Sequence, residues 1–80
     1  MTKVLIRAAR IAADRMSEAR TMLVGAAIAW RHRYEDHLSV VHLEHELERA
    51  ARWYERATDR WLRLDLAARR VMARAGARAA

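Results

Sequence analysis

The fold is decided by the second half of the chain, residues 40–75, which read VVHLEHELERAARWYERATDRWLRLDLAARRVMARA. Apolar or small residues recur here at alternating steps of three and four, at Val40, Leu43, Leu47, Ala50, Tyr54, Ala57, Trp61, Leu64, Ala68, Val71 and Ala75. A period of about 3.5 residues keeps one stripe of an α-helix against a partner helix along its whole length. We call this stripe the seam of the second helix, and it predicts a long helix packed against another.

The first half of the chain carries a matching seam. It consists of Leu5, Ala9, Ala12, Met16, Ala19, Leu23, Ala26 and Trp30. We therefore expect one all-α domain over residues 1–80, with helices over about 3–34 and 40–75, a turn over about 35–39 and a frayed tail over 76–80. Ser39 is the expected N-cap of the second helix, and Gly76 its expected C-terminal stop. Because the turn is short, the two helices should form an antiparallel hairpin.

Composition agrees with this all-α hairpin. The 80 residues include eighteen Ala, two Gly, no Pro and no Cys. Alanine is the best helix former and proline the worst, and the lack of cysteine excludes disulfides and cysteine zinc sites. The longest apolar run, residues 22–30, is much shorter than the roughly 20 residues that a membrane span needs. We therefore expect no membrane span. Arg7 and Arg10 also interrupt the apolar N-terminus, which leaves no signal-peptide core, and we expect a cytoplasmic protein.

Several large apolar residues lie off both seams. The expected oligomer interface is made of Ile11, Val24, Ile28, Trp53, Leu62 and Leu66. A two-helix hairpin hides one stripe of each helix, so these residues would face water in a monomer. We therefore expect the hairpin to associate with itself, most simply as a dimeric antiparallel four-helix bundle. The alternatives are a complex with another helical protein or a larger helical assembly.

Basic residues gather where the two ends of the chain should meet. The net charge is +6, and fifteen of the sixteen basic residues are Arg. Residues 1–13 and 66–80 contain no acid, and antiparallel folding brings together Lys3, Arg7, Arg10, Arg69, Arg70, Arg74 and Arg78. Clustered cations bind nucleic acid by releasing condensed counterions, so a nucleic-acid-binding hairpin dimer is the alternative function. Arginine-rich coding and the dipole at the second helix's C-terminus offer a simpler interpretation of part of this charge.

A second row of arginines follows the second helix. It contains Arg49, Arg52, Arg56, Arg60 and Arg63. Acids stand four residues before two of these arginines, in the pairs Glu48–Arg52 and Asp59–Arg63, at the spacing of helical ion pairs. We therefore expect this row to be a solvated, salt-bridged face.

The four histidines all fall within residues 32–45. His42, His45 and Glu46 share one helix face by their spacing, which is a pattern that can hold a transition metal. A metal-binding helical bundle is therefore a further alternative function. His42 and His45 point away from the seam, however, whereas the metal sites of helical bundles project inward, and this favours a surface cluster. No other cofactor is expected.

Catalytic motifs are missing from the sequence. Ser17 and Ser39 are the two serines, and the chain contains no glycine-rich phosphate loop. We expect no catalytic residue and no enzymatic activity. The sequence therefore indicates a small basic oligomerisation or assembly protein that acts as a binding module.

Overall fold

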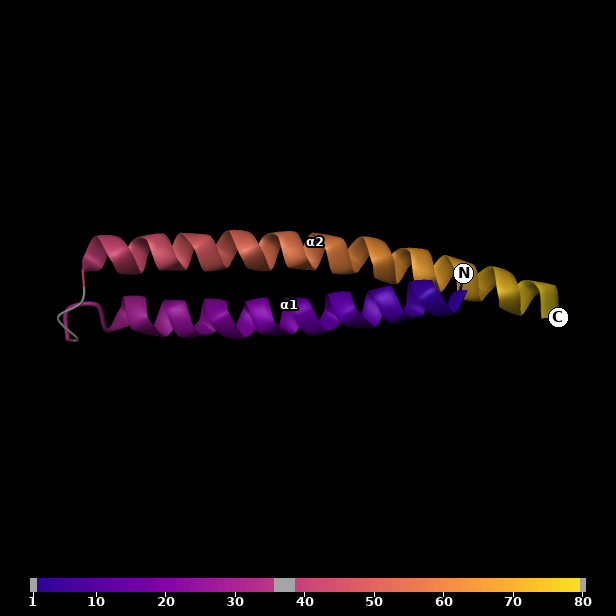
Figure 1. Cartoon of the computed structure of the whole chain (residues 1–80), viewed down its shortest axis with the longest axis horizontal. Coiled ribbons are helices and arrows are strands. Elements are labelled where there is room, and N and C mark those ends of the chain that lie inside the picture. The colour runs from indigo at the N-terminus through magenta and orange to yellow at the C-terminus, as the bar shows by residue number, and fades with distance from the viewer. Residues whose placement is uncertain (1, 36–38, 80) are drawn as a thin grey trace.

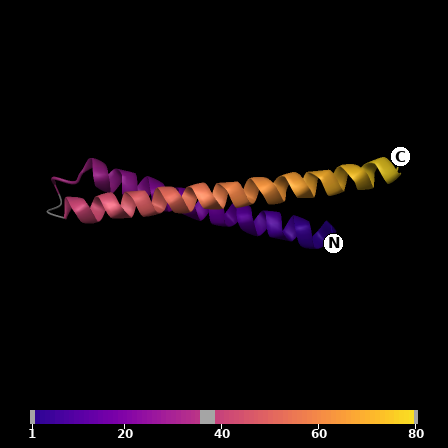
Figure 2. The same ribbon diagram turned by 90° about the horizontal axis from the view of Figure 1, so that it is seen from above.

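The computed structural model of the chain is a hairpin of two antiparallel helices (Figure 1). Helix α1 spans Thr2–Arg31 and helix α2 spans Val40–Ala79. The structure describes residues 2–35 and 39–79. The hairpin is a rod with extents of 63 × 15 × 14 Å, and its two helices cross at a shallow angle when seen from above (Figure 2). The predicted all-helical hairpin is confirmed.

The two seams form the contact between the helices. Five residues are buried, and all belong to the seams: Ala12, Ala19, Leu43, Ala50 and Ala68. The other seam residues are half-buried, with the exception of Ala75. No large side chain is fully buried in the part of the chain that the structure describes. Small residues at the contact allow the two helix axes to approach closely. They bury little apolar surface, so the core is thin.

Helix α2 is ten residues longer than α1, with 40 residues against 30. Thr2 shares a shallow groove with Val71 and Arg74, so α1 begins level with that part of α2. The last turns of α2 extend past α1 (Figure 1). Ala75 lines the same groove as Thr2 and is exposed, because only the first residues of α1 lie at its level. None of the described helices is long and apolar enough to cross a membrane.

The start of α2 is capped by Ser39, as predicted. Its hydroxyl Oγ accepts a hydrogen bond from the amide of His42 at 3.3 Å, and its carbonyl accepts one from the amide of Leu43 at 3.0 Å. The first bond satisfies an amide that has no partner inside the helix, and the second is the first backbone hydrogen bond of the helix itself. Residues 36–38 of the expected turn lie outside the described residues.

The end of α1 falls earlier than the expected Tyr34. The helix stops at Arg31, and residues 32–35 form turns. The guanidinium of Arg33 donates a hydrogen bond to the carbonyl of Trp30 at 3.0 Å, and its Cζ lies 4.5 Å and 4.7 Å from the ring centroids of Trp30 and Tyr34. An arginine that satisfies a terminal carbonyl and stacks on two rings stabilises a helix end at this point.

Gly76 does not end α2, contrary to the expectation from the sequence. The helix continues through Gly76 to Ala79, and the expected frayed tail is helical over these residues. Gly76 does not adopt the left-handed backbone conformation that a glycine stop requires. A helical glycine costs about 1 kcal/mol relative to alanine, and the neighbouring Ala77 and Arg78 are strong helix formers that offset this cost. Ala80 lies outside the described residues.

One buried polar atom in the contact between the helices lacks a partner. Within the described ranges, the hydroxyl oxygen of Thr58 is buried without a hydrogen bond. We expect Thr58→Val to raise the free energy of unfolding by about 1 kcal/mol, because valine keeps the shape and removes an unsatisfied group. Urea unfolding followed by circular dichroism measures the change.

Thr21 provides the control for this substitution. It is exposed, and its hydroxyl donates a hydrogen bond to the carbonyl of Ser17 at 3.1 Å. We therefore expect Thr21→Val to leave stability unchanged or slightly lower. A destabilised Thr58→Val protein would show that the Thr58 hydroxyl has a partner in solution.

Candidate functional site

The residues predicted to form an oligomer interface are all exposed in the hairpin. Their exposed fractions run from 37% for Trp53 to 53% for Ile28. The full set is Ile11, Val24, Ile28, Trp53, Leu62 and Leu66. Val4, Met22, Val41 and Met72, which were not assigned to the interface, are exposed as well. The structure thus places the whole predicted set in contact with water, while its role in association stays a prediction.

Charge on α2 is sorted between the two sides of its seam. The residues that immediately precede the seam residues from Ala50 to Ala75 form what we call the basic flank: Arg49, Trp53, Arg56, Arg60, Arg63, Ala67, Arg70 and Arg74. The residues that immediately follow the seam residues from Leu43 to Val71 form the acidic flank: Glu44, Glu48, Ala51, Glu55, Thr58, Leu62, Asp65, Arg69 and Met72. Over the whole seam, the side that contains the basic flank holds six arginines and one acid, Glu46, whereas the side that contains the acidic flank holds four acids and one arginine.

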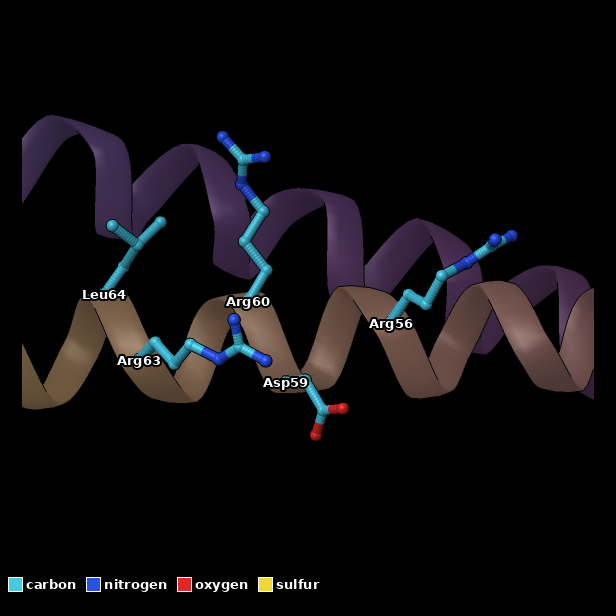
Figure 3. A pocket seen from close by; sticks show the side chains of 5 residues that line it. All are labelled: Arg56, Asp59, Arg60, Arg63 and Leu64. Carbon is cyan, nitrogen blue, oxygen red and sulfur yellow. The ribbon is translucent and has the colours of Figure 1, made fainter.

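The middle of the basic flank is a shallow groove of about 460 Å³ (Figure 3). It is lined by Arg56, Asp59, Arg60, Arg63 and Leu64. Arg56 and Arg60 extend from α2 towards the side of α1, while the carboxylate of Asp59 points in the opposite direction (Figure 3). The guanidinium groups of Arg56 and Arg60 therefore lie on the side where the two helices meet, whereas that of Arg63 extends along α2 towards Asp59 (Figure 3).

A second groove adjoins the first towards the hairpin tip. Met22 of α1 lines it together with residues of α2, which are Glu46, Arg49, Ala50, Trp53 and Arg56. Trp53 thus lies between two arginines of the basic flank and shares the groove with Met22 of α1. The apolar pattern of the sequence predicts an oligomer interface at Trp53, and it does not indicate the two arginines that flank this residue.

The predicted ion pairs on α2 do not form. Glu48–Arg52 and Asp59–Arg63 are both absent from the salt bridges found within residues 2–35 and 39–79. Exposed pairs of this kind contribute only a few tenths of a kcal/mol, so solvation of the separate charges competes with them.

Two arginines of α2 do pair with an acid. Arg49 Nη1 lies 3.5 Å from Glu46 Oε1, and Arg69 Nε donates a hydrogen bond to Asp65 Oδ2 at 2.8 Å. On the basic flank, the five arginines beyond Arg49 form no salt bridge with any described carboxylate: Arg56, Arg60, Arg63, Arg70 and Arg74. These five guanidinium groups are available to an external anion.

The predicted basic end does not gather into one patch. Its seven members are exposed, but they lie on different sides of the hairpin. Lys3, Arg7 and Arg10 line a groove formed by α1 alone, together with Val4, Ile6, Ile11 and Asp14. Arg74 and Arg78 line a separate groove with Thr2. Arg69 lies on the acidic flank and is paired with Asp65, while Arg70 and Arg74 belong to the basic flank.

The described histidines, His32, His42 and His45, are not assembled around a common point. Among the described residues, no three His, Asp or Glu side chains come together as a group that could hold a metal ion. His42, His45 and Glu46 therefore gain no support as metal ligands, and metal binding stays a prediction. His32 Nδ1 lies 2.8 Å from Glu35 Oε2, so this histidine pairs with the residue at i+3. Asp36, four residues after His32, lies outside the described residues.

Known proteins offer no guide to which of these surfaces is used. No protein-family model matches the chain, and no match was found among the curated proteins or the solved structures.

Proposed function

We propose that the chain is a small self-associating helical module in which the exposed apolar residues of two hairpins pack into a four-helix bundle. Such a protein acts by assembly and binding, without a catalytic step. The observation that carries the proposal is the amount of surface that a single hairpin leaves in water.

The surface of the single hairpin is large for its mass. The chain exposes 6677 Å², whereas a compact protein of its mass exposes about 5000 Å². Its radius of gyration is 18.1 Å, against about 12 Å for a compact domain of this length. The excess surface is about 1700 Å² per chain, and a stable dimer buries about 800 Å² or more on each partner. Pairing of two rods therefore supplies the compactness that one rod lacks.

The thin core supports the same proposal. A long helix in water draws most of its stability from the packing of its apolar face, and the seams here bury mainly alanine. Larger side chains remain exposed, including Val24 on α1 and Leu62 on α2. Helical register puts these two residues on the same side of the hairpin, next to the acidic flank. A second hairpin on this side would bury them and leave the basic flank free.

Size-exclusion chromatography with light scattering tests the proposal. We expect the wild-type chain at micromolar concentration to have twice the mass of one 9.3 kDa chain. The double variant Leu62→Gln/Leu66→Gln should shift to the monomer mass, because it removes two apolar anchors from the packed surface while glutamine keeps the helix. A wild-type monomer at that concentration would contradict the proposal.

The chain offers a control in the same helical register. Glu48 and Arg52 occupy the same two positions of the heptad as Leu62 and Leu66, and both are exposed. The double variant Glu48→Gln/Arg52→Gln introduces the same residues and keeps the net charge. It should remain a dimer, and a loss of the dimer in this control would show that apolar packing is not the cause of association.

A further inference from the structure

We propose that the basic flank of α2 is a binding surface for the phosphate backbone of a nucleic acid. The surface is centred on Arg56, Arg60 and Arg63 and continues through Arg70 and Arg74. This inference does not depend on self-association, because it concerns the side of the hairpin away from Leu62.

The sorting of charge on α2 is the first support. Arginine-rich coding would raise the number of arginines on every side of a helix. On α2, six arginines and one acid, Glu46, lie on one side of the seam, while four acids and one arginine lie on the other. The total charge of the chain does not explain this division. A surface that attracts an anion on one side does explain it.

The shape of the basic flank favours a long anion over a small one. From Arg49 to Arg74 the flank extends for about 37 Å at 1.5 Å per residue. Its members follow the seam at alternating steps of three and four, so they stay on one side of the rod instead of winding around it. Guanidinium groups bind phosphate oxygens through pairs of hydrogen bonds. A row of them suits a polymer with a phosphate at every step.

The flank lacks competing anions over most of its length. Glu46, which pairs with Arg49, lies at the end nearest the hairpin tip. Asp59 lines the central groove, but its carboxylate points away from Arg56 and Arg60 (Figure 3). Arg63 extends towards Asp59 in the same view, but the two form no salt bridge. The arginines of the basic flank from Arg56 onward form no salt bridge with a described acid, so an incoming phosphate would not have to break one.

Trp53 adds a feature that a simple electrostatic surface does not need. Its side chain is 37% exposed between Arg49 and Arg56. Aromatic side chains beside a basic track stack with the unpaired bases of single strands. Trp53 therefore provides the means to distinguish single-stranded from duplex nucleic acid on this surface.

Fluorescence anisotropy with labelled 20-nucleotide probes, one single-stranded and one duplex, tests the inference. The triple variant Arg56→Gln/Arg60→Gln/Arg63→Gln should weaken binding at low salt by about tenfold or more, because three phosphate contacts are lost. The slope of log affinity against log salt should decrease by about 2 to 3. Circular dichroism verifies that the variant stays helical.

A control variant removes the same charge elsewhere. Arg20, Arg31 and Arg52 are exposed and lie off the basic flank. Their triple replacement by glutamine should weaken binding by less than about threefold, since it alters only the overall field. An equal loss in the two triple variants would overturn the assignment to the basic flank.

Further measurements distinguish nucleic acid from anionic lipid, and the basic flank from the basic groove of α1. Loss of binding in Lys3→Gln/Arg7→Gln/Arg10→Gln, with the basic flank variant unaffected, would move the site to α1 and overturn the inference. Binding to vesicles with anionic lipid, without binding to either probe, would overturn it in favour of a membrane surface. Trp53→Leu should weaken binding of the single strand by about fivefold, and of the duplex much less, if bases stack on the ring.

Discussion

Replacement of Ala19 by leucine is expected to lower the free energy of unfolding by about 2 kcal/mol or more. Ala19 is fully buried, with 0% of its surface exposed, in the middle of the contact between α1 and α2. A leucine side chain adds three carbons where the backbones of two straight helices are close. Urea unfolding at a fixed protein concentration, followed by circular dichroism, measures the loss.

The expected loss in the free energy of unfolding is large because the two helices cannot move apart at Ala19 alone. Two long helices behave as rods, so a larger residue at Ala19 pushes neighbouring seam residues apart over several turns and reduces their contacts. Ala73 serves as the control, because it is an exposed alanine on α2. Ala73→Leu should change stability by less than about 0.5 kcal/mol. An Ala19→Leu protein as stable as this control would show that the helices do not meet through the seams.

The seams could be predicted from the sequence because they depend on spacing alone. Apart from Ala75, all residues placed on the two seams are buried or half-buried, and the six apolar residues assigned to an oligomer interface are exposed. Burial on a helix follows from periodicity, which a single sequence displays directly. The exception, Ala75, depends on the relative lengths of the two helices, which periodicity does not give.

The ends of the helices and the ion pairs were harder to predict. The stop of α1 depends on Arg33 contacting Trp30 and Tyr34, a three-residue arrangement that leaves no periodic signal. Ion pairs on α2 depend on small energies, because water competes with every exposed acid for the arginine within its reach. Spacing identified the acids within reach of an arginine and could not select among them.

The basic flank was readable in the sequence but was divided between two features. Arg49 to Arg63 were grouped with Arg52 as a salt-bridged row, and Arg70 and Arg74 were assigned to the basic end. Once the seam is known to be the contact, each arginine can be placed by its position immediately before a seam residue. By this criterion Arg52 leaves the row, and Arg70 and Arg74 join it. The arginines of α2 could therefore be assigned to one side of the helix only after the residues that contact α1 were known.

Replacement of Leu43 by alanine is the second change expected to have a large effect, a loss of about 2 to 3 kcal/mol in the free energy of unfolding. Leu43 is 6% exposed and is the largest of the five buried side chains. It lies across from Ala26 and Ala29 of α1, with which it lines a common groove. Small neighbours cannot fill the space that leucine leaves, so the variant gains a cavity instead of a repacked core. Thermal and urea unfolding both measure the loss.

Because Leu43 lies at the start of α2, the variant should lose local stability there in addition to overall stability. Its amide donates the first hydrogen bond to Ser39, so the side chain and the N-cap together hold the start of α2 against the end of α1. Hydrogen exchange of amides near residues 40–44 should therefore accelerate more in Leu43→Ala than exchange near Ala68. His45→Ala places alanine at an exposed position two residues away and should change stability by only a few tenths of a kcal/mol. If the two variants unfold at the same urea concentration, Leu43 does not hold the closed end of the hairpin.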